Sequence, residues 1–179
     1  MMAQNAVDVL ARTLWGEARS CGATGMKRVA NVIMNRAAHP RWWGRDVISV
    51  CQAPYQFSCW NAKDPNRPKI LAVTAHDPWF AIALAIAQQA VNGGLEDLTK
   101  GADCYYALTM PKPPTWAARA VHTVSDSWHW FGRVELPAPS GDPDAPNWSH
   151  TAQAGADAAV LASATEDLNA AELARIKGA

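Results

Sequence analysis

The sequence carries few cysteines and no spacing typical of a structural metal site. Only four of its 179 residues are cysteine, too few for a disulfide scaffold at this length. No two cysteines are separated by two residues, and no HExxH motif is present, which argues against zinc. We expect no metal, no cofactor and free thiols. Cys51 and Cys59 are, however, close enough in sequence to form a disulfide bridge with each other.

Long apolar runs are also missing. No segment approaches the roughly 18 apolar residues of a membrane-spanning helix. The N-terminus does not pair basic residues with an apolar run of signal-peptide length. We therefore expect a protein without an integral membrane segment, synthesised in the cytoplasm without a signal peptide. Action on an external target would then need release by another agent.

Charge is scarce and balanced, with 16 Lys and Arg against 16 Asp and Glu. Residues 1–135 carry 14 basic against 10 acidic side chains, and the remainder is acidic. This excess is too small to predict a nucleic-acid partner. With 49% hydrophobic residues, the composition is typical of one folded domain.

Helical and strand patterns follow one another along the chain. Apolar spacing predicts helices over 4–18 and about 25–38, and capping residues bracket a third over 77–92. The third is so apolar that we expect it to be the buried central helix. Segment 39–70 is expected to be loop-rich, with a short helix near 46–51. Strands are expected at 104–108, 122–124 and 128–131, with a short helix at 116–121. These elements predict an α+β, mainly α fold with a small antiparallel sheet.

The same pattern divides the chain into three parts. Residues 1–136 are expected to form the folded domain, and 137–150 have the Pro- and Asp-rich composition of a linker. Residues 151–179 are Ala-rich and predict a weakly amphipathic helical tail. We expect a monomer.

Glu17 is the residue most suggestive of chemistry. It continues the apolar stripe of the first predicted helix, beside Leu14 and Trp15. Burial beside such side chains raises the pKa of a carboxyl group, and a carboxyl that stays protonated near neutral pH can act as a general acid. The alternative is a structural Glu at a helix end, bonded to a backbone amide or to Arg19. Because a pairing with Arg19 would oppose the acid role, we expect Arg19 to point elsewhere.

Tryptophan is abundant, with nine residues, and offers flat faces that suit stacking on sugar rings. Trp42 and Trp43 are adjacent on a predicted loop between Pro40 and Gly44. Two adjacent tryptophans cannot easily both face the core. We expect at least one to line a substrate groove or to pack beneath the loop, and Trp43 is the candidate.

Several blocks in order resemble the cell-wall hydrolase family of the spore-cortex-lytic enzymes, which also includes phage and prophage lysins. The resemblance covers about residues 5–133. The blocks are 14–19 (LWGEAR), 29–36 (VANVIMNR), 48–51 (ISVC), 56–60 (QFSCW), 101–106 (GADCYY), 114–117 (PTWA) and 129–131 (HWF). One departure is Cys104, where relatives often carry His.

The resemblance implies a lysozyme-like or lytic-transglycosylase-like domain that cleaves bacterial peptidoglycan. The catalytic glutamate of the family falls on Glu17. The other candidate substrate-binding residues are Trp43, Gln56, Phe57, Ser58, Trp60, Asp103, Tyr105, Tyr106 and His129. Together with the missing signal segment, the resemblance favours a phage or prophage endolysin that acts on the wall after release.

The number of carboxylates separates the mechanisms. Most glycosidases use two, ~5–5.5 Å apart for retention or ~6.5–9.5 Å for inversion. Only Glu17 sits in a dense motif, which favours a lytic transglycosylase that closes a 1,6-anhydro ring without water. Hydrolysis by a muramidase or glucosaminidase remains the alternative, with Asp103 or Asp126 as the partner. Asp126 resembles a turn residue, and Asp103 could equally cap the strand.

Three other functions compete with glycan cleavage. A zinc amidase would need histidine ligands, which only His122 and His129 in the predicted hairpin could begin to supply. A Cys–His peptidase would need a thiolate beside a histidine. A non-catalytic wall-binding module would use the tryptophans but would not need an acid on an apolar helix face.

Overall fold

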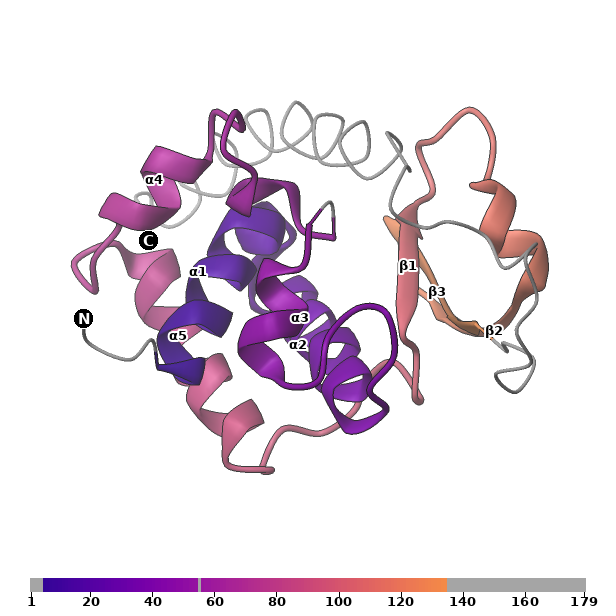
Figure 1. The fold of residues 1–179 in the computed structure, drawn as a ribbon, viewed down its shortest axis with the longest axis horizontal. Helices are drawn as coiled ribbons and strands as arrows, with labels where there is room; N and C mark the ends of the chain where they lie inside the picture. Colours follow the sequence, from indigo (N-terminus) through magenta and orange to yellow (C-terminus); the bar gives the residue numbers. More distant parts are fainter. Residues whose placement is uncertain (1–4, 55, 135–179) are drawn as a thin grey trace, which may run out of the picture.

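The computed structural model describes residues 5–54 and 56–134. Its elements in chain order are α1 (Ala6–Ala18), η1 (Arg19–Cys21), α2 (Gly22–Ala38), α3 (Val47–Gln52), η2 (Ser58–Trp60), α4 (Arg67–Ala72), α5 (Pro78–Val91), β1 (Cys104–Ala107), η3 (Thr115–Arg119), β2 (Ala120–Ser125) and β3 (His129–Val134). The helices gather on one side of the molecule and the sheet stands on the other (Figure 1). The predicted mainly α, α+β architecture is confirmed. The predicted linker and tail lie outside the described residues.

Helix α1 is the most buried helix of the described part. Asn5 caps it by accepting from the Val7 amide at 2.9 Å. Leu10, Ala11 and Leu14 are fully buried, and α1 packs against α2, α3, α4 and α5. This face is the apolar stripe expected from the sequence. It places Glu17, in the last turn, where the helices converge.

Helix α5 occupies a more peripheral position than its composition predicts. Asp77 caps it by accepting from the Phe80 amide at 2.9 Å, and Pro78 stands at its first position, as expected. Its buried side holds Phe80, Ala83, Ile86 and others, but Ala81 and Ala85 are exposed. The expectation of a buried central helix was wrong, because alanine tolerates exposure as readily as burial.

Segment 39–70 is more ordered than expected. The capping box of Asp46 and Ser49 starts α3, close to the predicted short helix. Helix α4 was missed, because Pro68 was taken as a loop signal although it stands in the first turn of a helix, where proline is tolerated. Arg12 fastens α4 to α1 by donating to the carbonyls of Ile70 and Val73.

The three strands form an antiparallel sheet in the order β1–β3–β2. Cys104 pairs with Gly132, and β2 pairs with β3 across an irregularity between His122 and Val124. Gly132 has a steric purpose: a Cβ there would lie 2.3 Å from the Trp130 ring. All three predicted strands are thus present, and the predicted helix at 116–121 is a 3₁₀ helix ending at Arg119.

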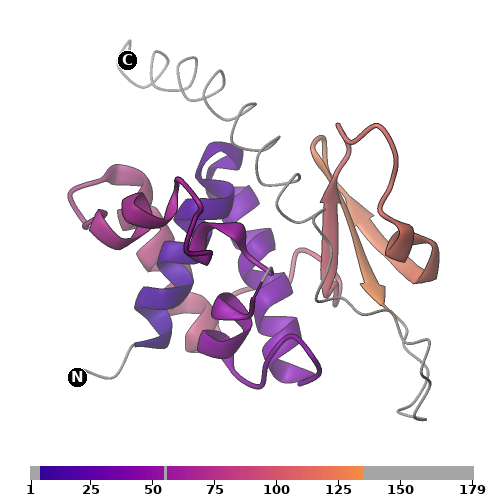
Figure 2. The same ribbon diagram turned by 45° about the horizontal axis from the view of Figure 1, so that its top comes forward.

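Polar side chains of α2 hold the sheet region against the helices. Arg28 forms an ion pair of 2.9 Å with Asp126 in the turn between β2 and β3. Asn31 bonds the backbone of Glu96 and Leu98, and Asn35 donates to the Ala102 carbonyl at 3.0 Å. The turned view in Figure 2 shows β1 as the strand that faces the helices. No helix among the described residues is long and apolar enough to cross a membrane.

Candidate active site

Glu17 lies in the last turn of α1 with its side chain only partly exposed. Burial raises its pKa from an ordinary 4.5 to about 7. The Cys59 backbone amide donates to Glu17 Oε1 at 3.4 Å, and this hydrogen bond lowers the pKa of Glu17 by less than burial raises it. The carboxyl group is therefore close to half protonated at neutral pH, which suits a group that gives and then takes a proton.

Arg19 turns back onto its own helix, as the sequence predicts. It donates to the carbonyls of Trp15 and Gly16 at 2.9 and 3.3 Å, and its guanidinium lies 4.2 Å from the centre of the Trp15 ring. The positive charge of Arg19 lowers the pKa of Glu17, but by less than burial or the charge of Asp64 raises it. The acid role is thus not opposed by a strong neighbouring cation.

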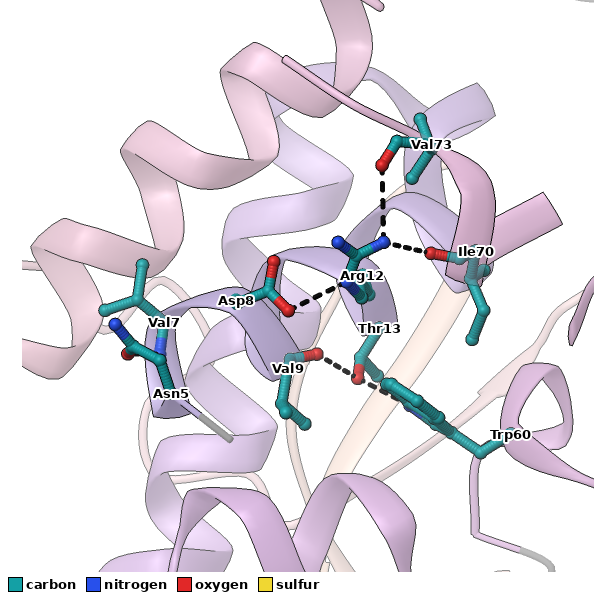
Figure 3. A network of polar contacts seen from close by, with 9 residues as sticks. All are labelled: Asn5, Val7, Asp8, Val9, Arg12, Thr13, Trp60, Ile70 and Val73. Atoms are coloured by element: carbon teal, nitrogen blue, oxygen red, sulfur yellow. Dashed lines mark hydrogen bonds and ion pairs between the residues drawn. The ribbon is translucent and has the colours of Figure 1, made fainter. Parts of the chain in front are cut away.

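Helix α1 is joined to η2 and α4 by a polar network (Figure 3). The Trp60 indole N–H donates to the Thr13 hydroxyl at 2.9 Å, and that hydroxyl donates to the Val9 carbonyl at 2.8 Å. Trp60 remains partly exposed. The segment after Phe57 is therefore fixed on the helix that carries Glu17.

Arg36 organises a second group of predicted site residues. Its guanidinium donates to the Asp103 carbonyl at 2.6 Å and to Gln56 Oε1 at 3.2 Å. It also lies 5.7 Å from the ring centre of Trp43 and 5.6 Å from that of Phe57. Arg36 lies in the last turn of α2 and is only 9% exposed, so it joins the helices to the sheet from a buried position.

The predicted site residues divide into buried and accessible ones. Glu17, Gln56, Trp60, Tyr105 and Tyr106 keep partial exposure. The buried ones are Trp43, Phe57, Ser58, Asp103 and His129, each less than 9% exposed. The first group is accessible to a ligand, whereas the second is packed beneath the surface.

Trp43 packs beneath its loop rather than lining a surface. It is 2% exposed, and its indole N–H donates to the carbonyls of Arg36 and His39 at 3.0 and 3.1 Å. Trp42 is the exposed member of the pair, at 41%. Trp43 therefore packs against the C-terminal end of α2, whereas Trp42 faces solvent.

Asp103 has a backbone partner. Its Oδ1 accepts from the Val134 amide at 2.8 Å, and its own amide donates to the Gly132 carbonyl. Burial raises its pKa, and the bond from Val134 opposes that rise. Of the alternatives left open by the sequence, this geometry favours the role of a cap between β1 and the end of β3.

The two consecutive tyrosines of β1 contact different rings. Tyr105 stacks on Phe131 at 5.7 Å and meets His129 edge-on at 5.8 Å. Tyr106 stacks on Trp130 at 5.2 Å. Because side chains alternate along a strand, the two point to opposite faces of the sheet.

Only Tyr105 packs against the helical core. Burial raises its pKa well above the ordinary value, and the negative charge of Glu17 is the next cause. Tyr105 therefore belongs to the surroundings of Glu17, and Tyr106 to an aromatic cluster with Trp116 and Trp130 on the other face.

Asp64 is a neighbour of Glu17 that the sequence did not indicate. This residue lies between η2 and α4, and its negative charge raises the pKa of Glu17. Its Oδ1 accepts from the Asn66 amide at 2.7 Å, as in an Asx turn. In the sequence Asp64 lies in a segment expected to be loop-rich, and no local pattern there predicts that it comes near Glu17.

The cysteines are free, as expected. Burial raises the pKa of Cys51 to about 12 and raises those of Cys59 and Cys104 further. Burial also lowers the pKa of His129, the most buried histidine within the described residues. Within residues 5–54 and 56–134, no three His, Cys, Asp or Glu side chains are grouped so as to hold a metal ion.

The site thus contains a partly exposed carboxyl group with a raised pKa, near Tyr105 and the segment that carries Trp60. The family model for cell wall hydrolases matches residues 21–131, and the chain belongs to that family. This membership supports an enzyme that acts on peptidoglycan. Glu17 lies just before the matched segment. Comparisons with curated proteins and with solved structures gave no match.

Proposed function

We propose that the protein cleaves the glycan strand of peptidoglycan between MurNAc and GlcNAc as a lytic transglycosylase, with Glu17 as its single acid and base. The observation that carries the proposal is the pKa of Glu17, raised to about 7 in a side chain that solvent still reaches. Membership of the cell wall hydrolase family supplies the substrate class.

One carboxyl group is sufficient for this reaction. Protonated Glu17 gives its proton to the glycosidic oxygen as the bond from that oxygen to the muramyl C1 breaks. The carboxylate then takes the proton of the muramyl 6-hydroxyl, whose oxygen bonds to C1. Glu17 is protonated again, no water is consumed, and the product ends in a 1,6-anhydro ring. A pKa near neutrality serves both steps.

Accessible residues near Glu17 are suited to hold the strand. Gln56 offers its amide N–H donors, since its Oε1 accepts from Arg36. Trp60 on η2 and Tyr105 on β1 are both partly exposed residues. Sugar rings stack on aromatic faces, so these residues would fix the strand over the carboxyl group.

Hydrolysis is the second candidate, and Asp64 is the observation that favours it. Its carboxylate acts electrostatically on Glu17, whereas Asp103 already bonds the Val134 amide. A second carboxylate could activate a water molecule and give a hydrolysed end. The two mechanisms therefore differ in what they require of Asp64.

The other rivals receive less support. A Cys–His peptidase needs a thiolate, but burial raises the pKa of Cys51 and Cys59 and keeps both thiols protonated. A pure wall-binding module has no use for a carboxyl group with a pKa near 7. Iodoacetamide and EDTA should both leave lysis unchanged.

Mass spectrometry of the muropeptides released by the wild type, Glu17→Gln and Asp64→Asn tests the proposal. A transglycosylase gives ends lighter by one water molecule. Glu17→Gln should lose about 10²–10⁴-fold in rate, the usual size of general acid catalysis. Asp64→Asn should keep most of the activity.

The matched control is Glu96→Gln, at an exposed position of the segment after α5. Hydrolysed ends that disappear in Asp64→Asn would establish the second mechanism. Full lysis by Glu17→Gln, with binding lost on changing Trp60 or Tyr105, would establish a binding module instead.

We further propose that the protein acts as a phage or prophage endolysin on the wall. The support is the resemblance of its motifs to phage and prophage lysins. Expression in a host cell should cause lysis only when the inner membrane is permeabilised separately. Lysis without permeabilisation would contradict the proposed route of release.

A further inference from the structure

Thr13 is a polar residue on the buried face of α1. Like Leu10 and Leu14 on the same face, it is completely buried. A hydroxyl group in such surroundings costs free energy unless it is hydrogen-bonded. The single hydroxyl proton of Thr13 is donated to the Val9 carbonyl at 2.8 Å. The oxygen can therefore serve a further partner only as an acceptor.

The further partner of the Thr13 hydroxyl is Trp60. The indole N–H donates to the hydroxyl oxygen at 2.9 Å, so that Thr13 lies between Val9 and Trp60 (Figure 3). The indole group has one donor and no acceptor, so this bond uses its whole capacity for hydrogen bonding. The nitrogen edge of the ring is therefore tied to α1, although Trp60 remains partly exposed.

This bond lies one helical turn from Glu17. Thr13 and Glu17 are four residues apart, so they lie on the same face of α1 with about 5–6 Å between their Cβ atoms. The main chain before Trp60 is held to this face separately. The Cys59 amide donates to Glu17 Oε1 at 3.4 Å, and a Cβ on Gly16 would lie 2.9 Å from the Cys59 Cβ. Cys59 thus places the turn, and the Thr13 hydroxyl places the ring that follows it.

We propose that Thr13 is a positioning residue for substrate binding: its buried hydroxyl holds the Trp60 ring in the orientation in which a sugar of the glycan strand stacks on it beside Glu17. The inference rests on the proposed function, which places a sugar against Trp60. A ring that is held in place before the sugar arrives loses less conformational freedom on binding, so binding is tighter. Because Thr13 is completely buried, it acts through Trp60 and not by touching the strand.

Thr13→Val tests the proposal, because valine has a similar shape but no acceptor. The KM for soluble glycan strands should rise about three- to tenfold, the equivalent of one hydrogen bond, while kcat stays within about twofold of the wild type. Thr13→Ser keeps the hydroxyl and should return the KM to within about twofold of the wild type. A purely structural role would reduce the amount of folded protein, which lowers the apparent kcat and leaves the KM unchanged.

The matched control is Thr99→Val. Thr99 is also completely buried, but its hydroxyl donates to Asp97 in the segment between α5 and β1. This substitution should leave the KM unchanged, whatever it does to stability. An unchanged KM in Thr13→Val would overturn the inference, as would an equal rise of the KM in Thr13→Ser or in Thr99→Val.

Exchange of the indole protons in the wild-type protein, measured by NMR without substrate, does not depend on the folding of Thr13→Val. The Trp60 N–H signal is assigned by its absence in Trp60→Phe. It should exchange with water about tenfold or more slowly than the N–H of Trp128, which is 43% exposed. Equal exchange would overturn the inference, because the ring would then not be held. If Thr13→Val does not fold, this measurement and the KM of Thr13→Ser decide.

Failure of the inference and failure of the proposed function give different results. An unchanged KM in Thr13→Val, together with an inactive Glu17→Gln, would overturn the inference and leave the proposed function standing. A KM raised in Thr13→Val and restored in Thr13→Ser, together with a fully active Glu17→Gln, would uphold the inference and overturn the proposed role of Glu17.

Discussion

The helices direct buried polar side chains at backbone groups, whereas the sheet stacks aromatic rings against one another. Around α1 and α2, Arg12, Thr13 and Arg36 each bond a main-chain carbonyl. Beyond β1, Tyr106, Trp116 and Trp130 contact one another instead. The helical region is therefore fixed by bonds to the main chain, whereas the sheet is fixed on its outer face by ring contacts. Tyr105 and Arg36 are two of the places where the two regions meet, besides the Arg28–Asp126 ion pair.

Replacing Arg36 should have the largest effect on stability. Arg36→Met leaves the Asp103 carbonyl and Gln56 without their charged donor, and should lower the free energy of unfolding by about 2–4 kcal/mol. Urea unfolding measures the loss. The control is Arg45→Met, at an exposed position before α3. Equal stability of the two variants would show that the regions are not joined through Arg36.

Glu17→Gln should stabilise the helical region at alkaline pH. Between pH 4.5 and 7 the folded protein keeps a proton that the unfolded chain has released, so stability falls as the pH rises through this window. Glutamine removes that loss and should add roughly 1–3 kcal/mol at pH 8. Thermal unfolding at pH 8 and pH 4 measures it. A gain of the same size at both values would contradict a raised pKa.

The two tyrosines of β1 test which face of the sheet serves the reaction. Tyr105→Phe removes a hydroxyl beside Glu17 and should lower the rate about tenfold, the equivalent of one hydrogen bond of about 1.4 kcal/mol. Tyr106→Phe should change the rate by less than about twofold. Initial rates on purified peptidoglycan compare them. The reverse order would assign substrate contact to the outer aromatic cluster.

The ion pair between Arg28 and Asp126 should have the smallest effect. Its side chains are 22% and 12% exposed, so Arg28→Ala should cost roughly 1 kcal/mol, and less in high salt. Lys27→Ala, one position earlier on α2, is the control. Unfolding at two salt concentrations measures the difference, and a salt-independent loss would point to packing rather than charge.

Local patterns in the sequence predicted the elements well. Asp77 caps α5 as predicted, and all three strands begin within two residues of their predicted starts. Two expectations failed for the same reason: helix α4 was not predicted, and α5 was expected to be buried. Proline and alanine were interpreted from their average behaviour, while the packing around them decided the outcome.

The candidate site was less predictable than the fold. Glu17 could be found because its neighbours in sequence are also its neighbours on the helix. Asp64 and Cys59 could not, because they reach Glu17 through a turn whose path depends on Thr13 and Trp60. The burial of Trp43 and His129 likewise depends on contacts with distant segments.

Gly132 carries a consequence for anyone who redesigns this enzyme. The Trp130 ring occupies the space that a side chain at 132 would fill, only 2.3 Å from where its Cβ would stand. Even alanine would have to tilt the indole away from Tyr106. The packing of the aromatic cluster of Tyr106, Trp116 and Trp130 thus depends on Gly132, a residue that has no ring.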